Sequence, residues 1–167
     1  MLTYHARIAG GTVEVVTPGD EVVEMDGRLL SQLAAETSRP LTLREQEGAN
    51  YDDSPVLLIN LATIASFGAE VGMELDRRRF RANLYVDGFA PEEEVGWVGR
   101  RVVVGEVELD VVSRCVRCVI ITRDPDTTAA TPELLRSLAE THDECLGVYC
   151  QVTRPGRVSV GDPVHVV

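Results

Sequence analysis

The fold is decided by a run that is rich in β-branched residues, carries two cysteines and ends in a proline turn: Ser113-Arg114-Cys115-Val116-Arg117-Cys118-Val119-Ile120-Ile121-Thr122, followed by Asp124-Pro125-Asp126-Thr127. β-Branched residues favour extended backbone, so the run predicts a strand over 116–122 that stops at the turn. Cys118 lies beside Arg117 and near Arg114, and a thiol near fixed positive charge is biased toward the thiolate that ligates metals. The alternative is a small buried hydrophobic residue, the usual role of a free cysteine.

Similar strand patterns recur through the chain. Apolar runs bounded by turn residues predict strands at 12–16, 55–59, 79–86, 101–104, 106–112, 148–153, 157–160 and 164–167, with Gly105 as a tight turn. Helices are predicted at 27–36, capped by Asp26, at 61–70 and at 131–140. Many short strands with few helices predict a mainly β fold of the α+β class, closed or nearly closed into a β-barrel.

Length and composition indicate one domain. A chain of 167 residues is long enough for one sizeable core and too short for two ordinary domains, so we expect a single domain over 1–167. No apolar run approaches the roughly 20 residues of a membrane-spanning helix, and the N-terminus lacks a signal pattern, so we expect a cytoplasmic protein without a membrane partner. The net charge of −11 argues against nucleic acid as a partner.

Lysine is absent, so all 16 basic residues are arginine. A lysine Schiff base and a phosphate-binding Walker lysine are therefore excluded. Any anion held by side-chain cations must be held by arginine, whose planar fork suits phosphate and carboxylate.

Four spaced motifs together resemble the MOSC domain, named for the C-terminal domain of molybdenum-cofactor sulfurases. They are Asp76-Arg77-Arg78-Arg79-Phe80-Arg81-Ala82-Asn83, Trp97-Val98-Gly99, the run from Cys115 to Thr127, and Gly161-Asp162-Pro163-Val164. The resemblance runs from about Tyr51 to the C-terminus and is strongest to the amidoxime-reducing component branch. It implies a β-barrel fold. The N-terminal β-domain of that branch is expected to be lacking, since residues 1–50 match only in outline.

The resemblance also implies a set of site residues. Cys118 corresponds to the protein thiolate on molybdenum, and Arg81, Asn83 and Arg117 correspond to residues that bind the molybdenum cofactor. A strand over 79–86 would present Arg81 and Asn83 on one face, although a charge run is more often a solvated face. Asn60, where the family more often has threonine, is a further cofactor candidate.

The Cys-x-x-Cys pair has two other readings. Cys115 and Cys118 could form half of a zinc site completed by Cys145 and Cys150, although that second spacing is loose. A redox dithiol is a further alternative, but such a motif normally opens a helix, and the residues after Cys118 are predicted to continue a strand. His5, His142 and His165 are interpreted as surface or strand-end residues.

Two functions from different classes follow from the resemblance. The first is a molybdenum-cofactor enzyme that reduces N-hydroxylated or N-oxide small molecules, with electrons from a separate flavin or iron–sulfur protein. The second is a non-redox sulfur carrier or cofactor-binding module, in which Cys118 bears a persulfide. A buried, inert Cys118 with a purely structural role is a third possibility.

Overall fold

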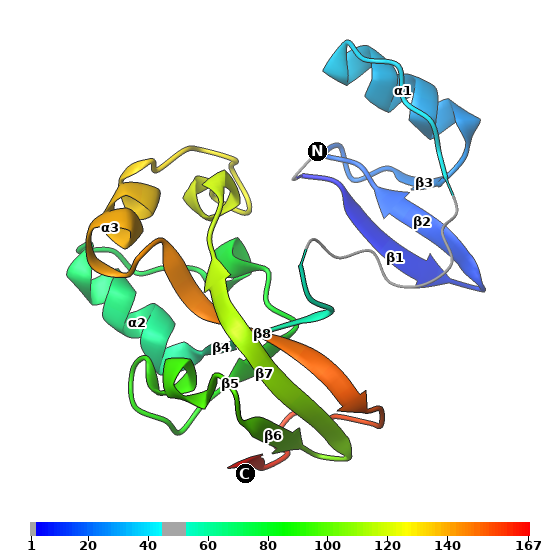
Figure 1. The fold of residues 1–167 in the computed structure, drawn as a ribbon. Coiled ribbons are helices and arrows are strands. Elements are labelled where there is room, and N and C mark those ends of the chain that lie inside the picture. Colours follow the sequence, from blue (N-terminus) through cyan, green and yellow to red (C-terminus); the bar gives the residue numbers. More distant parts are fainter. Residues whose placement is uncertain (1–2, 45–52) are drawn as a thin grey trace. The chain divides into compact units, whose positions relative to one another are not determined.

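The computed structural model describes residues 3–44 and 53–167. The chain divides into two compact units, Met1–Gly48 with Pro125–Thr128 and Ala49–Asp124 with Ala129–Val167. Figure 1 shows the elements of both, coloured along the chain. Within the described ranges, no helix is long and apolar enough to cross a membrane. The expectation of one domain over 1–167 stays a prediction.

The first unit is a small antiparallel sheet that packs against one helix. Its elements are β1 (His5–Ala9), β2 (Thr12–Val16), β3 (Val22–Glu24) and α1 (Gly27–Thr37). Gly10 and Gly11 join β1 to β2 with φ values of 57° and 87°, which suit the two-residue turn of a twisted hairpin. The Asp26 side chain caps α1, as predicted, and Leu29 of the helix packs with Val15 of β2.

The second unit is built on six strands in the order β5-β4-β8-β7-β6-β9. They are β4 (Val56–Asn60), β5 (Leu84–Val86), β6 (Arg101–Val104), β7 (Val107–Val116), β8 (Cys145–Arg154) and β9 (Val164–Val166). Neighbouring strands are antiparallel except β4 and β5, which are parallel. The sheet curls strongly (Figure 1), but its end strands β5 and β9 do not pair within the described residues. The α+β class with a barrel-type sheet is confirmed, and the sheet is a half-barrel rather than a closed one.

Short helices connect these strands. They are α2 (Leu61–Glu70), α3 (Glu133–Thr141) and the 3-10 helices η1 (Arg77–Phe80), η2 (Glu93–Trp97) and η3 (Val119–Thr122). The helix predicted at 61–70 has the observed bounds, because Asn60 ends β4 and caps α2 by accepting the N–H of Ala62. Gly105 turns the chain between β6 and β7 at a φ of 56°, as expected.

Both faces of the sheet are buried at β4. Leu57 and Ile59 enter one apolar cluster with Phe67 of α2, and Leu58 enters a second cluster with Trp97. Successive side chains on a strand point to opposite faces, so a strand buried on both sides needs an unbroken apolar run. This explains the unbroken apolar sequence of β4. Its last residue, Asn60, is fully buried and lies directly before α2.

The strand predicted over 79–86 is wrong in its first half. The chain forms η1 there instead, with the Asp76 side chain as its cap. The Tyr85 hydroxyl donates to one backbone carbonyl of η1 and accepts the N–H of Ala82, which folds the segment back. Arg81 then ends η1 at a φ of 54°, and strand pairing begins only at β5.

Two other predicted strands also differ. β7 ends at Val116 and η3 replaces the expected continuation, because Thr122 Oγ1 donates to Val119 O at 2.7 Å and Ile121 is buried in the cluster that contains α3. Residues 157–160 are not a strand. There the N–H of Ser159 donates to the Asp162 carboxylate at 2.7 Å, which closes a loop before β9.

Candidate functional site

A groove on the second unit brings two predicted site residues together. Its volume is about 1160 Å³, and most of its lining comes from within residues 77–89 and 158–164. Arg81 and Asn83 line it, as do the rings of Tyr85 and Phe89. The groove therefore combines polar groups with an apolar surface, which is typical of small-molecule sites.

Asn83 lines the groove while it holds the edge of β4. Its N–H donates to Leu57 O at 2.9 Å and its Oδ1 accepts the Leu57 N–H at 2.8 Å. The side chain thereby satisfies backbone groups of β4 in place of a strand neighbour. Its Nδ2 has no hydrogen-bond partner among the described residues, so one amide donor is left for a ligand.

Arg81 is exposed, and its guanidinium forms no ion pair within the described ranges. Nearby, the Arg77 guanidinium lies 5.3 Å from the ring centroid of Tyr85. The charged residues that line the groove are Arg77, Arg78, Arg81, Asp87 and Asp162. Cations outnumber carboxylates in this lining, although the whole chain carries a charge of −11.

Arg117 ties the end of β7 to η1. Its Nη2 donates to Phe80 O at 2.6 Å, and its Nη1 lies 3.1 Å from Cys115 Sγ. Because Phe80 precedes Arg81 and Arg117 precedes Cys118, this contact holds the two predicted cofactor-binding segments next to each other. The Nε of Arg117 is buried without a hydrogen-bond partner in the described structure.

Cys118 is an exposed thiol at the start of η3, on extended backbone with φ −110° and ψ 179°. It is not among the residues that line the groove. The two arginines near it in sequence are engaged elsewhere: Arg114 contacts His142 O and Asp143, and Arg117 contacts the carbonyl of η1 and Cys115. The two guanidinium groups that are close to Cys118 in sequence therefore contact other groups in the structure.

The other cysteines give no support to a zinc site or a redox dithiol. Cys115 is buried, and its hydrogen bond with Tyr149, together with burial, raises the pKa of that tyrosine to about 12. Burial likewise raises the pKa of the Cys150 thiol to about 12. In residues 3–44 and 53–167, no three His, Cys, Asp or Glu side chains are arranged so that they could hold a metal ion. The strand predicted to continue after Cys118 is wrong, since η3 begins at Val119, but Cys115 is buried and Cys118 is exposed.

Asn60 is fully buried, and its side-chain amide already has partners. Nδ2 donates to Ala90 O at 2.7 Å and approaches Phe89 O at 3.4 Å, and the Asn60 N–H donates to Glu94 Oε1 at 3.2 Å. Burial raises the pKa of the Glu94 carboxyl, although its hydrogen bonds oppose the shift. Asn60 therefore positions the loop that carries Phe89, and its predicted contact with a cofactor stays a prediction.

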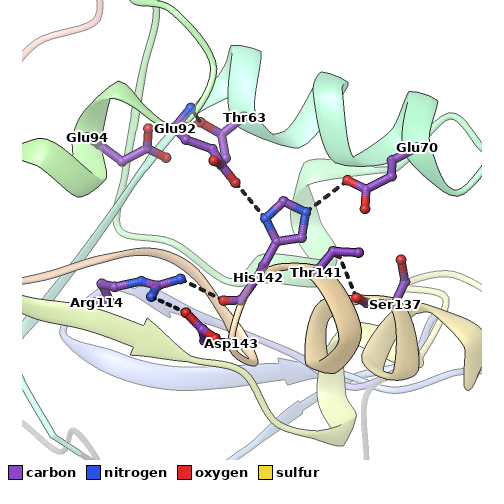
Figure 2. Close-up of polar contacts among 9 residues, drawn as sticks. All are labelled: Thr63, Glu70, Glu92, Glu94, Arg114, Ser137, Thr141, His142 and Asp143. Atoms are coloured by element: carbon purple, nitrogen blue, oxygen red, sulfur yellow. Dashed lines mark hydrogen bonds and ion pairs between the residues drawn. The ribbon is translucent and has the colours of Figure 1, made fainter.

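His142, predicted as a surface or strand-end residue, lies between two carboxylates. Its Nε2 lies 2.8 Å from Glu70 Oε2 and its Nδ1 lies 2.5 Å from Glu92 Oε1 (Figure 2). The ring also meets Phe67 edge to face, with centroids 5.6 Å apart. Burial lowers the pKa of His142, but the two carboxylates more than offset this and raise it overall. Both partners are distant in sequence, so no local pattern could have indicated the cluster.

Comparison with known proteins agrees with this architecture. The family model described as MOSC domain matches residues 45–165, which include the groove, Cys118 and the His142 cluster. The YiiM proteins of Geobacillus stearothermophilus and Escherichia coli have TM-scores of 0.55 and 0.53, and each is 19% identical. Each likeness covers 69% of this chain and 55% of the other, and it concerns the fold alone.

Two curated relatives have longer chains. Human mitochondrial amidoxime-reducing component 1 is 27% identical over 132 residues, which is 71% of this chain and 39% of that protein. The molybdenum cofactor sulfurase of Caenorhabditis elegans is 31% identical over 153 residues, which is 87% of this chain and 21% of that protein. The chain thus spans less than half the length of these relatives. Because the family match extends over most of its residues, the chain belongs to the MOSC domain family.

Proposed function

We propose that this protein binds a molybdenum cofactor and reduces N-hydroxylated or N-oxide small molecules, with Cys118 as the metal ligand. The names of the relatives, an amidoxime-reducing component and a molybdenum cofactor sulfurase, motivate the cofactor and the substrate class. The observation that carries the proposal is the contact between Arg117 and Phe80 O, which joins the segment of Cys118 to the segment of Arg81 and Asn83.

The donors left in this region fit an anionic pterin-phosphate group. Arg81 and Asn83 line the groove with a guanidinium and an amide nitrogen that have no partners in the described residues. The buried Nε of Arg117 is likewise unsatisfied, and such a group costs about 1–3 kcal/mol unless it finds an acceptor. Cys118 offers an exposed soft sulfur ligand, which suits molybdenum.

When bound, the cofactor would supply two-electron abstraction of an oxygen atom. Reduction of an N-hydroxylated substrate breaks the N–O bond, takes up two electrons and two protons, and releases the N–H product and water. The electrons would come from a separate flavin or iron–sulfur protein. In this scheme Arg81 and Asn83 hold the cofactor, Cys118 ligates the metal, and Arg117 positions both segments.

The test is the molybdenum and pterin content of the full chain purified from a host that makes the cofactor. We expect near-stoichiometric metal in the unaltered protein, loss of metal in Cys118→Ala, and reduced pterin in Arg81→Gln. Arg136→Gln is the matched control, because Arg136 is an exposed arginine on α3 away from the groove lining. Absence of molybdenum and pterin from the unaltered protein would refute cofactor binding by this chain.

The exposure of Cys118 also favours a second candidate, a sulfur carrier. A donor persulfide would transfer its outer sulfur to the Cys118 thiolate and leave as a thiolate, so that Cys118 becomes the persulfide. Cyanide would then remove this sulfur as thiocyanate and regenerate the thiolate. Stoichiometric thiocyanate that disappears in Cys118→Ala, in a protein free of molybdenum, would favour the carrier over the enzyme.

A further inference from the structure

The segment between β5 and η2, residues 87–92, forms part of the groove. Asp87 and Phe89 line the groove, and the Phe89 ring meets Trp97 edge to face with centroids 4.8 Å apart. On the other side, Asn60 binds the carbonyls of Phe89 and Ala90. The far end of the segment is Glu92, whose N–H donates to Thr63 Oγ1 at 2.8 Å. A movement of Glu92 would therefore move the segment that lines the groove.

Glu92 has a backbone conformation that needs external support. Its φ is 62°, in the left-handed region that a non-glycine residue rarely adopts. Its carboxylate contacts His142 Nδ1, and the other ring nitrogen faces Glu70 of α2 (Figure 2). The histidine therefore bridges the groove segment to a regular helix.

The geometry of this bridge requires a particular protonation state. A neutral imidazole carries one N–H and one lone pair, so it can donate to only one of two carboxylates. Both ring nitrogens of His142 face carboxylate oxygens, so only the doubly protonated ring satisfies both. Other charged groups lie on the backbone side: Arg114 of β7 donates to His142 O and pairs with Asp143. These contacts hold the turn and leave the ring to the two glutamates.

We propose that Glu70, His142 and Glu92 form a protonation-dependent clamp that fixes the groove segment 87–92 when the ring carries both protons. Loss of one proton turns one carboxylate contact into a repulsion with a lone pair. Glu70 lies on a regular helix, whereas Glu92 is held in a strained conformation. Glu92 is therefore the partner that is released, and the segment relaxes.

The direction of the pH dependence follows from the carboxylates. They raise the pKa of His142 above its ordinary value of 6.5, despite the opposing effect of burial. The stabilisation from the clamp is complete below that ordinary value and is lost as the pH rises through the raised value. The clamp is therefore closed at pH 6.5 and opens as the pH rises through the raised pKa of His142. This does not depend on the proposed cofactor.

The single tryptophan, Trp97, reports on the segment, because it is buried against Phe89. The experiment follows the assigned His142 ring and the Trp97 indole by NMR between pH 5.5 and 9.5, with acrylamide quenching of Trp97 fluorescence alongside. We expect one shared midpoint above 6.5 and stronger quenching at high pH. Glu92→Gln keeps an acceptor without the charge and should lower the midpoint.

Two variants separate the clamp from a general effect of pH. His142→Gln should abolish the transition and give the high-pH quenching at all pH values, whereas His165→Gln, at an exposed position of β9, should leave the transition unchanged. A Trp97 signal that stays flat while the His142 ring titrates would overturn the proposal. If circular dichroism shows that His142→Gln does not fold, the titration of the unaltered protein still tests the proposal.

Discussion

Gly147 of β8 offers a sharp test of how tightly the half-barrel packs. Its φ is 81°, and a Cβ there would collide with the Ile59 side chain and lie 2.9 Å from Leu58 O. Gly99 has a similar φ of 85°, but nothing lies within 4 Å of its Cβ position. Both positions therefore carry the same conformational penalty for alanine, and only Gly147 adds a steric one.

The expected magnitudes follow from these two contributions. Alanine in the left-handed region costs about 1–2 kcal/mol, so Gly99→Ala should reduce the free energy of unfolding by that amount. Overpacking adds about 1–3 kcal/mol, so Gly147→Ala should lose roughly 2–5 kcal/mol in total. Replacing glycine by alanine also lowers the conformational entropy of the unfolded chain, and this stabilising contribution is the same in both variants.

Urea unfolding followed by Trp97 fluorescence and by circular dichroism measures both changes. The difference between the two variants isolates the packing of β8 against β4. Equal destabilisation by the two alanines would refute the close contact of β8 with Ile59 and Leu58.

Three other predictions concern the site. Burial raises the pKa of Glu94 above 4.5. The contribution of this carboxyl to stability is therefore complete below pH 4.5 and is lost as the pH rises through the raised pKa. Urea unfolding at pH 4 to 7 should show this pH dependence in the unaltered protein and a flatter one in Glu94→Gln. Asn60→Ala removes a helix cap and leaves carbonyls unpaired, so it should cost about 2–4 kcal/mol, and a variant with unchanged unfolding would contradict the structural role. Cys118→Ser should change stability by no more than about 0.5 kcal/mol and remove the fastest-alkylated thiol of the native protein, as mass spectrometry would show; if the buried Cys115 reacts first, the assigned exposure is wrong.

Local signals predicted the elements whose contacts are local. The polar residue Asp26 before a leucine-rich segment marked the start of α1, and its side chain does cap that helix. Gly105 marked the turn between two valine-rich strands and adopts positive φ there. The unbroken apolar run of β4 indicated a strand, and the two core clusters show that both of its faces are buried.

The same signals failed where a side-chain contact decided the backbone conformation. The alternation after Arg79 indicated a strand, but the Tyr85 hydroxyl binds backbone groups on both sides of Arg81 and holds a turn. The run after Cys118 is rich in β-branched residues, yet it forms η3 because Ile121 packs into the cluster with α3. Intrinsic strand preference is worth less than the burial of such a side chain.

The candidate site divides in the same way. The sequence alone determined which residues are candidates for cofactor binding, since the motif around Cys118 and the pair Arg81 and Asn83 are defined by residue type and spacing. The proposed roles of these residues stay predictions. Only the tertiary structure decided that Arg117 contacts Phe80 and Cys115 rather than Cys118, and that His142 lies between Glu70 and Glu92. Hydrogen bonds and ion pairs depend on distances of a few ångströms between segments far apart in the chain, and those distances exist only after the sheet and its helices have packed.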